Sequence, residues 1–172
     1  MNSYRLSRSF IAFLVGVFVL AALLLSYSLT WAGTTATVAA TVSATNLSVS
    51  VSTGTITFGS VALNTSTTTA GHGYTQTVTN NGSDATLSVK ATNATNGTAW
   101  TLSTSPGSDA YKLQVSTTTG ASYMTLQSAN TYLTASTTFS SLTSGNLDFQ
   151  LTTPTASTDF VQKSITITVQ VS

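Results

Sequence analysis

The sequence predicts an all-β fold, a single β-sandwich of the jelly-roll or immunoglobulin-like type behind an N-terminal hydrophobic signal helix. Residues 10–25 are an unbroken run of apolar residues and glycine that follows two arginines, which is the order of an exported leader. After residue 33, apolar side chains alternate with Ser and Thr, which is the period of a β-strand. Turn-forming residues recur at intervals of about 8 to 12 residues, as sandwich and jelly-roll domains require. We expect a signal peptide or anchor over 1–32, an N-terminal extension over 33–45 and the β-sandwich over 46–172.

The leader contains Arg5 and Arg8, then the apolar run, then small residues that offer a cleavage point after Ala32. As a helix, the apolar run covers about 24 Å, which is less than the roughly 30 Å of a bilayer's hydrocarbon core. Three alternatives stay open at this point: a cleaved signal peptide, a retained membrane anchor, and a pilin-type helix kept inside a filament.

The composition excludes several classes of partner. Charged residues make up 5% of the 172 residues, and after the leader three lysines face four aspartates, a net charge of −1 with no glutamate. Nucleic-acid binding needs clustered Lys and Arg, so we expect none. Cysteine is absent, which excludes disulfides, thiolate zinc sites and cysteine nucleophiles. A surface of Ser, Thr and Asn with little charge repels its own copies weakly, which suits a polymer.

The alternation changes phase once, at Thr45 and Asn46. Because successive side chains in a strand point to opposite faces, such a slip would turn the apolar face of one continuous strand over. We therefore expect two strands, or one strand with a bulge. The apolar side chains stand at even positions before the slip and at odd positions after it: Val38, Ala40, Val42, Ala44, and then Leu47, Val49 and Val51.

Alternation also predicts the remaining strands, over 55–58, 73–79, 85–91, 100–102, 111–115, 123–127, 131–133, 147–151 and 165–171. An Asn-Asn-Gly-Ser sequence at 80–83 predicts a hairpin-type turn, since Asn-Gly accepts a positive φ. Residues 139–142 are compatible with one helical turn. Three aromatic residues fall in phase with apolar neighbours and are expected in the core: Tyr74, Trp100 and Tyr111.

No constellation of catalytic residues is evident. His72 is the only histidine and lies between two glycines, without the carboxylate in sequence that a hydrolase triad needs to hold its base. The scattered aspartates make neither a glycosidase pair nor a calcium loop, and no phosphate-binding glycine loop occurs. We expect no enzymatic activity, no cofactor and no metal. Five Asn-x-Ser/Thr sequons are candidate glycosylation sites: Asn46, Asn64, Asn81, Asn93 and Asn96.

Several segments together resemble a known kind of protein. The leader, the Thr/Val-rich segment after it, residues 56–61 and residues 78–82 are similar in layout to secreted matrix-fibre proteins of the TasA/camelysin type and to the related archaeal bundling pili. This resemblance covers most of the chain and implies jelly-roll subunits joined by donor-strand exchange. The sequence Trp-Thr-Leu at 100–102 resembles the WxL cell-wall-binding domain, but the second such motif of that family is missing, since the chain ends in alternating Ile and Thr.

Residues 34–44, which we call the donor segment, favour strand exchange by their own chemistry. After cleavage they would be the new N-terminus, uncharged and alternating small apolar with small polar side chains. Such a strand can complete the sheet of a neighbouring subunit, with Val38, Ala40, Val42 and Ala44 filling a groove. The contact is head-to-tail and grows an open filament. The alternative is that the donor segment is the first strand of its own sandwich.

The sequence therefore predicts a secreted, cell-surface structural subunit of a pilus or biofilm-matrix filament, with copies of itself as the partner. One alternative is a secreted cell-wall or carbohydrate-binding module that takes surface polysaccharide through aromatic side chains. The other is a pilin that retains its N-terminal helix. Contact with a membrane is expected only through the leader, before processing.

Overall fold

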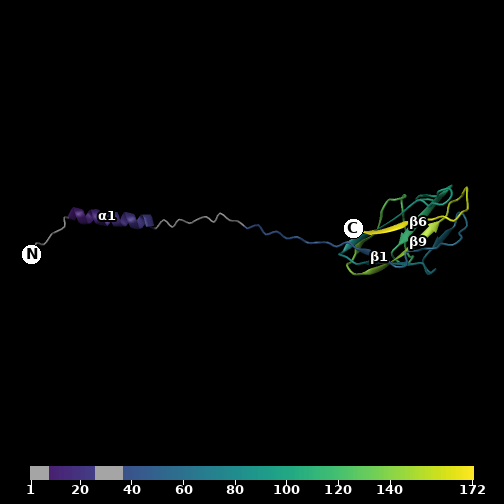
Figure 1. Ribbon diagram of the computed structural model, residues 1–172, viewed down its shortest axis with the longest axis horizontal. Helices are drawn as coiled ribbons and strands as arrows, with labels where there is room; N and C mark the ends of the chain where they lie inside the picture. Colours follow the sequence, from purple (N-terminus) through teal and green to yellow (C-terminus); the bar gives the residue numbers. More distant parts are fainter. Residues whose placement is uncertain (1–7, 26–36) are drawn as a thin grey trace, which may run out of the picture. The chain divides into compact units, whose positions relative to one another are not determined.

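The computed structural model describes residues 8–25 and 37–172, and it divides the chain into two units, residues 1–42 and 43–172 (Figure 1). In the first unit the apolar run is the helix α1 (Arg8–Leu25), with Phe13 and Phe18 exposed. Among the described helical residues, none forms a helix that meets the length and apolarity needed to cross a membrane. The predicted cleavage point after Ala32 and the first three residues of the donor segment lie outside the described residues.

The second unit confirms the predicted all-β fold, with its strands in two sheets. The seven-stranded sheet has the order β1-β3-β9-β6-β5, to which β2 adds beside β9 and β7 beside β6; the three-stranded sheet has the order β10-β4-β8. The strands are β1 (Val49–Val51), β2 (Ser66–Thr68), β3 (Gln76–Asn80), β4 (Ala85–Ala91), β5 (Thr101–Leu102), β6 (Ala110–Ser116), β7 (Met124–Thr125), β8 (Leu133–Phe139), β9 (Ser144–Thr152) and β10 (Ile167–Val171).

The alternating apolar positions form the core between these strands, as the sequence predicts. β4, β6 and β9 contribute the largest share, with side chains that are almost completely buried: Leu87, Val89, Leu113, Val115, Leu147, Phe149 and Leu151. Tyr111 is fully buried, and its hydroxyl donates to the carbonyl of Thr92. Burial raises the pKa of the Tyr111 phenol. Trp100 is half-buried against the same core, whereas Tyr74 is 40% exposed, so its predicted core position is wrong.

The turn at 80–83 differs from the predicted hairpin. It leads from β3 in one sheet to β4 in the other, and neither Asn81 nor Gly82 has a positive φ. Glycine is required for a different reason, because a Cβ on Gly82 would lie 2.1 Å from the carbonyl oxygen of Asn46. The buried Asn80 side chain holds the turn by donating to the carbonyls of Ser83 and Phe139, both at 2.8 Å.

Other local predictions also need correction. Residues 55–58 are not in a strand; instead Ile56 and Phe58 pack half-buried against the core. The helical turn expected at 139–142 is absent, since Phe139 ends β8 and Leu142 adopts a φ of 54° in the following turn. The sequence pattern also misses β2, whose residues are all Ser or Thr and therefore show no apolar alternation.

Candidate functional site

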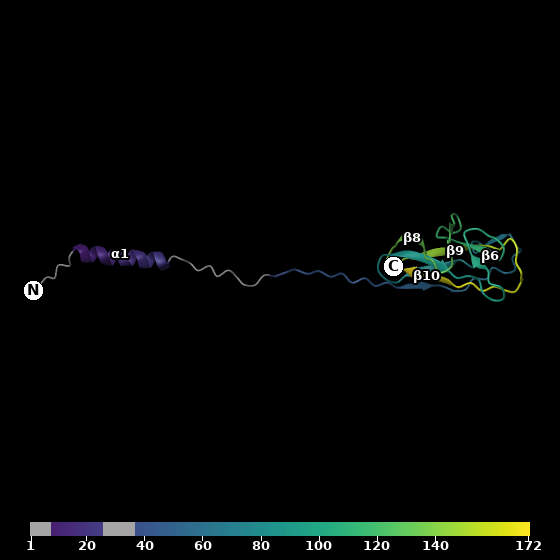
Figure 2. The same cartoon turned by 90° about the horizontal axis from the view of Figure 1, so that it is seen from above.

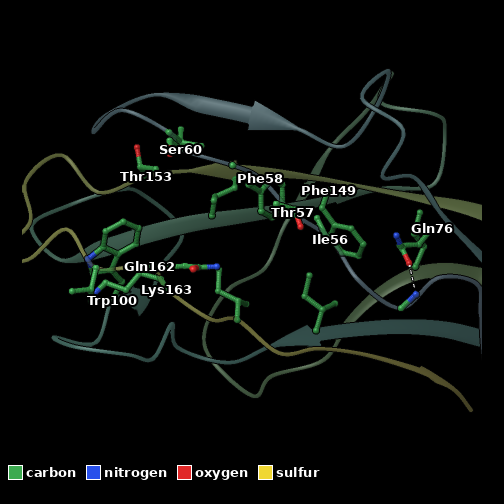
Figure 3. Close-up of a pocket in the computed structure, with 18 of the residues that line it drawn as sticks. Ile56, Thr57, Phe58, Ser60, Gln76, Trp100, Phe149, Thr153, Gln162 and Lys163 are labelled. Carbon is green, nitrogen blue, oxygen red and sulfur yellow. Dashed lines mark hydrogen bonds between the residues drawn. The ribbon is translucent and has the colours of Figure 1, made fainter.

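A cavity of about 940 Å³ opens between the β1 side of one sheet and the β10 side of the other, and we call it the groove (Figure 3). Most of the residues that line it are apolar. Figure 3 shows Trp100 and Lys163 at one end of it and Gln76 toward the other, with Phe58 and Phe149 between them. The main apolar lining comes from Ile56, Phe58, Phe149, Ile165, Ile167 and Val169.

Both strands beside the groove are the last in their sheets. Among the strands that the structure describes, β1 pairs only with β3, and β10 pairs only with β4. In an antiparallel pair, alternate residues exchange backbone hydrogen bonds with the partner while the residues between them point their backbone groups outward. A strand edge of this kind can accept a further strand.

Along residues 165–172, which contain β10 and which we call the β10 edge, the residues bonded to β4 and its flanks are the even-numbered ones. Ser172 exchanges both backbone bonds with Thr86, and the carbonyl of Thr166 accepts from the amide of Thr92. The odd-numbered residues therefore turn their backbone N–H and C=O groups toward the open edge, and within the described residues these groups have no hydrogen-bond partner. The side chains of Ile165, Ile167 and Val169 line the groove. The unpaired backbone groups belong to Ile165, Ile167, Val169 and Val171.

β1 repeats this arrangement on a shorter scale. The carbonyl of Ser48 accepts from Asn81, and the amide of Ser52 donates to the carbonyl of Thr77, so the backbone of Val49 and Val51 faces outward. The strand ends directly afterwards, since Thr53 has a φ of 67°, outside the β region.

The groove leaves core residues only partly covered. Ile56, Phe58, Ile165, Ile167 and Val169 pack against the core but remain half-buried. Phe160, which also lines the groove, is 79% exposed. A contiguous exposed apolar surface on a soluble domain marks an interaction site or a ligand groove.

Four side chains form a polar cluster at the Trp100 end of the groove, which we call the clasp: Trp100, Ser157, Asp159 and Lys163. The Trp100 indole nitrogen donates to Ser157 at 2.9 Å, and the Lys163 ammonium lies 5.5 Å from the centre of the indole ring. Lys163 also pairs with Asp159 at 2.5 Å. The hydrogen bond from Lys163, followed by that from the amide of Thr98, lowers the pKa of Asp159 to about 2. The clasp therefore fixes the segment that carries Phe160 against residues 95–100.

The clasp extends to a second carboxylate. Asp109 accepts hydrogen bonds from the Ser157 hydroxyl at 2.8 Å and from the amide of Thr158 at 3.1 Å. The bond from Ser157 is the main cause that lowers the pKa of Asp109. Both aspartates thus act as hydrogen-bond acceptors that hold a loop.

The described part of the donor segment is exposed and extended. Residues 37–48 are in no strand. Val38 and Val42 are 91% and 95% exposed, and Ala40 and Ala44 are exposed as well. The chain joins the second unit, which we call the β unit, at Asn46. The Asn46 amide donates to the Ser83 hydroxyl at 3.1 Å, and the Asn46 carbonyl accepts from the Ser83 amide at 2.7 Å. The phase slip in the sequence thus coincides with the point where the chain enters the sheet.

The candidate glycosylation sites differ in accessibility. Asn46, Asn64, Asn81 and Asn96 are exposed, and Asn93 is half-buried. The side-chain amides of three of these five asparagines form hydrogen bonds with other parts of the fold. Asn93 accepts from the amide of Leu102 at 2.9 Å, Asn81 donates to Ser50 at 3.0 Å, and Asn96 donates to the carbonyl of Gln162 at 2.8 Å.

The remaining chemistry-bearing residues do not come together. His72 is exposed in a loop, and the described residues contain no group of three or more His, Cys, Asp or Glu that could hold a metal ion. Asp148 is fully buried and accepts from the hydroxyls of Thr69 at 3.2 Å and Thr75 at 2.5 Å. These contacts tie the loop before β3 to β9.

The groove, rather than any reactive cluster, is thus the feature that calls for a function. Sequence reasoning found the alternation of 165–171 but missed Phe160 and Val161, which lie in no alternating run. Comparison of the chain with protein-family models, with curated proteins and with solved structures finds no match. A function therefore has to be inferred from the groove and from the donor segment.

Proposed function

We propose that this protein is a secreted structural subunit whose donor segment completes the β unit of a neighbouring copy and so builds an extracellular filament, such as a pilus or a biofilm-matrix fibre. The observation that carries the proposal is that one chain contains both a groove and a segment that could fill the groove of another copy. The β unit has an apolar groove between two unpaired strand edges. The chain also has an uncharged, alternating segment whose described residues, 37–44, are in no strand.

The energetics favour such an exchange. Fully burying one valine or leucine side chain is worth about 1.5–3 kcal/mol, and both Val38 and Val42 are almost fully exposed. The half-buried lining of the groove, including Ile167 and Val169, would lose its remaining exposure at the same time. An added strand would also supply partners for the outward backbone groups of β10.

The two-sheet fold with an added strand would be a closed β-sandwich, which is the finer form of the predicted architecture. The leader would deliver the chain across a membrane, and cleavage after Ala32 would free the donor segment. A low surface charge suits close packing of copies. The layout shared with matrix-fibre proteins of the TasA/camelysin type supports the same proposal.

The arrangement of aromatic residues favours the filament over a carbohydrate-binding module. Sugar binding by stacking would need exposed rings that share a platform. Tyr74 precedes β3 and Tyr132 precedes β8, which belong to different sheets, and Lys90 covers the Tyr132 ring at 4.6 Å. The Trp100 indole is bonded to Ser157 and covered by Lys163.

The experiment compares two adjacent substitutions in the exported protein. Val42→Asp places a charge on the apolar side of the donor segment and is expected to abolish filaments seen by electron microscopy. The matched control, Thr41→Asp, places the same charge on the opposite side of the strand and is expected to retain them. Circular dichroism of both purified subunits checks that each β unit is folded.

Deletion of residues 34–44 gives the second arm of the test. Without a donor segment the subunit is expected to be exported, folded and monomeric. Normal filaments from this shortened subunit would refute donor-strand assembly. N-terminal sequencing of the mature filament separates the pilin alternative, which requires the helix to be retained, from cleavage after Ala32.

A further inference from the structure

We infer that the donor segment of one copy adds to β10 of the next copy as an antiparallel strand, with its even-numbered side chains in the groove. This inference rests on the proposed function and deepens it, because two free edges, β1 and β10, border the groove. A strand in the groove could pair with either edge. The direction of the chain and the length of each edge select β10, and the parity of the side chains then decides which donor residues face the groove.

The two edge strands run in opposite directions between the two ends of the β unit. The turn at 81–84 lies beside the start of β1, since the amide of Asn81 donates to Ser48, and beside the end of β10, since Ser172 pairs with Thr86. We call this the turn end of the β unit; the opposite end, with Trp100 and Phe160, is the far end. Figures 1 and 2 show the C-terminus at one end of the β unit. β1 therefore leaves the turn end, and β10 runs toward it.

The donor segment leaves its own subunit at Asn46. Both backbone bonds of Asn46 to Ser83, and the close approach of Gly82 to the Asn46 carbonyl, fix that point at the turn end. In a head-to-tail polymer the turn end of one copy meets the far end of the next. The donor segment therefore enters its neighbour's groove at the far end, with Ala44 nearest the entrance and Val38 deepest.

This direction decides the type of pairing. A donor strand that lies so runs from the turn end to the far end of the copy that receives it, which is parallel to β1 and antiparallel to β10. Antiparallel pairing is slightly more stable per residue. The edges also differ in length, since β1 offers only Val49 and Val51 before the positive φ of Thr53 ends it. The β10 edge offers outward backbone groups from Ile165 to Val171.

The alternation of side chains along both strands decides whether the even-numbered or the odd-numbered donor residues face the groove. The outward backbone groups of the β10 edge belong to odd-numbered residues, and the side chains of Ile165, Ile167 and Val169 line the groove. Residues directly opposite each other in an antiparallel pair share a face. The donor residues opposite Ile165, Ile167 and Val169 must therefore be those whose apolar side chains also point inward, which are the even-numbered ones. The polar partners, such as Thr41 and Ser43, then face solvent.

The lining of the groove sets the register. Ile165, Ile167 and Val169 line it, whereas Val171 does not. The three apolar residues deepest in the donor segment therefore lie opposite these three. This places Val38 opposite Val169, Ala40 opposite Ile167 and Val42 opposite Ile165, and leaves Ala44 at the entrance beside the clasp. Small alanines alternate with valines along the donor segment, opposite larger side chains of β10.

Disulfide trapping tests this arrangement, and the chain contains no cysteine that would add background. Opposite residues in a hydrogen-bonded antiparallel pair have Cα atoms about 5.5 Å apart, which is within the range that a disulfide spans. Full-length copies with Val42→Cys are mixed with tagged copies carrying Ile165→Cys, assembled and then oxidised. Because each copy has one cysteine, a tagged heterodimer on a non-reducing gel reports a link between subunits.

The expected result is a heterodimer for Val42→Cys with Ile165→Cys and for Val38→Cys with Val169→Cys. Loss of the heterodimer is expected for the matched control, Thr41→Cys with Ile165→Cys, and for the reversed pair, Val42→Cys with Val169→Cys. Crosslinking of Val42→Cys to Val51→Cys in place of Ile165→Cys would overturn the assignment to β10 while leaving donor-strand assembly intact. Filaments that form without any of these links would overturn the proposed register on β10, and filaments that also form after deletion of residues 34–44 would overturn donor-strand assembly.

Discussion

β9 and β10 carry the same alternating apolar pattern but differ in how it is covered. Phe149 in β9 is 1% exposed, because β9 lies between β3 and β6 and its inward face is packed over by the core. Ile167 and Val169 in β10 stay half-buried, because β10 has a hydrogen-bonded neighbour strand on one side only. A period of two therefore determines which way a side chain points, but its burial depends on the neighbouring strands.

The comparison also separates stability from assembly. The β9 region is complete within one chain, so its side chains should determine how stable a single subunit is. The β10 edge is incomplete within one chain, so its side chains should matter most when a second copy is present. Three predictions test this separation.

The largest expected effect is on the free energy of unfolding of the monomer. Leu113→Ala should lower it by about 2–5 kcal/mol, because Leu113 is fully buried away from the groove and the substitution leaves a cavity in a covered core. Ile167→Ala should lower it by less, since that side chain already contacts solvent. Urea unfolding of both variants in the non-assembling Val42→Asp background measures the difference. Equal losses would mean that the groove is no less packed than the rest of the core.

A smaller effect is expected from supplying the missing strand. A synthetic peptide of residues 34–44, added to the Val42→Asp subunit, should bind its empty groove and raise its thermal midpoint. At a peptide concentration 100-fold above Kd, the stabilisation would be about 2.7 kcal/mol. The same peptide carrying Val42→Asp is the control and should leave the midpoint unchanged. A midpoint that responds equally to both peptides would contradict a specific groove.

The smallest effect concerns the clasp and its pH dependence. The pKa of Asp159 lies at about 2, below the usual 3.8, so its ion pair stabilises the clasp at neutral pH. That contribution is present above about pH 4 and is lost as the pH falls toward 2. Cleavage of the leader would remove Trp31 and leave Trp100 as the single tryptophan, so the fluorescence of the mature subunit should change over that window. Asp159→Asn should remove that change, and an unaltered titration would refute the role of Asp159.

The sequence was a sufficient guide where burial follows from local pattern. The strands around Leu87, Leu113 and Leu147 were predictable because each alternates without interruption. β2 was not predictable, because Ser and Thr give no hydrophobic signal and its place beside β9 depends on long-range pairing. The sequence pattern placed Gly82 in a turn but gave the wrong reason why a glycine is needed there. Gly82 has no positive φ, and its need for a small side chain comes from the backbone of Asn46, a residue distant in sequence.

By itself, the sequence determined that the chain after the apolar run is all-β, which residues of the alternating strands face inward, and that an uncharged alternating segment precedes the phase slip. These features follow from side-chain period and composition, which are local. The tertiary structure alone decided which strands end a sheet, because strand order depends on contacts between residues far apart in the chain. The unpaired edge of β10, the groove beside it and the proposed site for the donor segment all depend on that order.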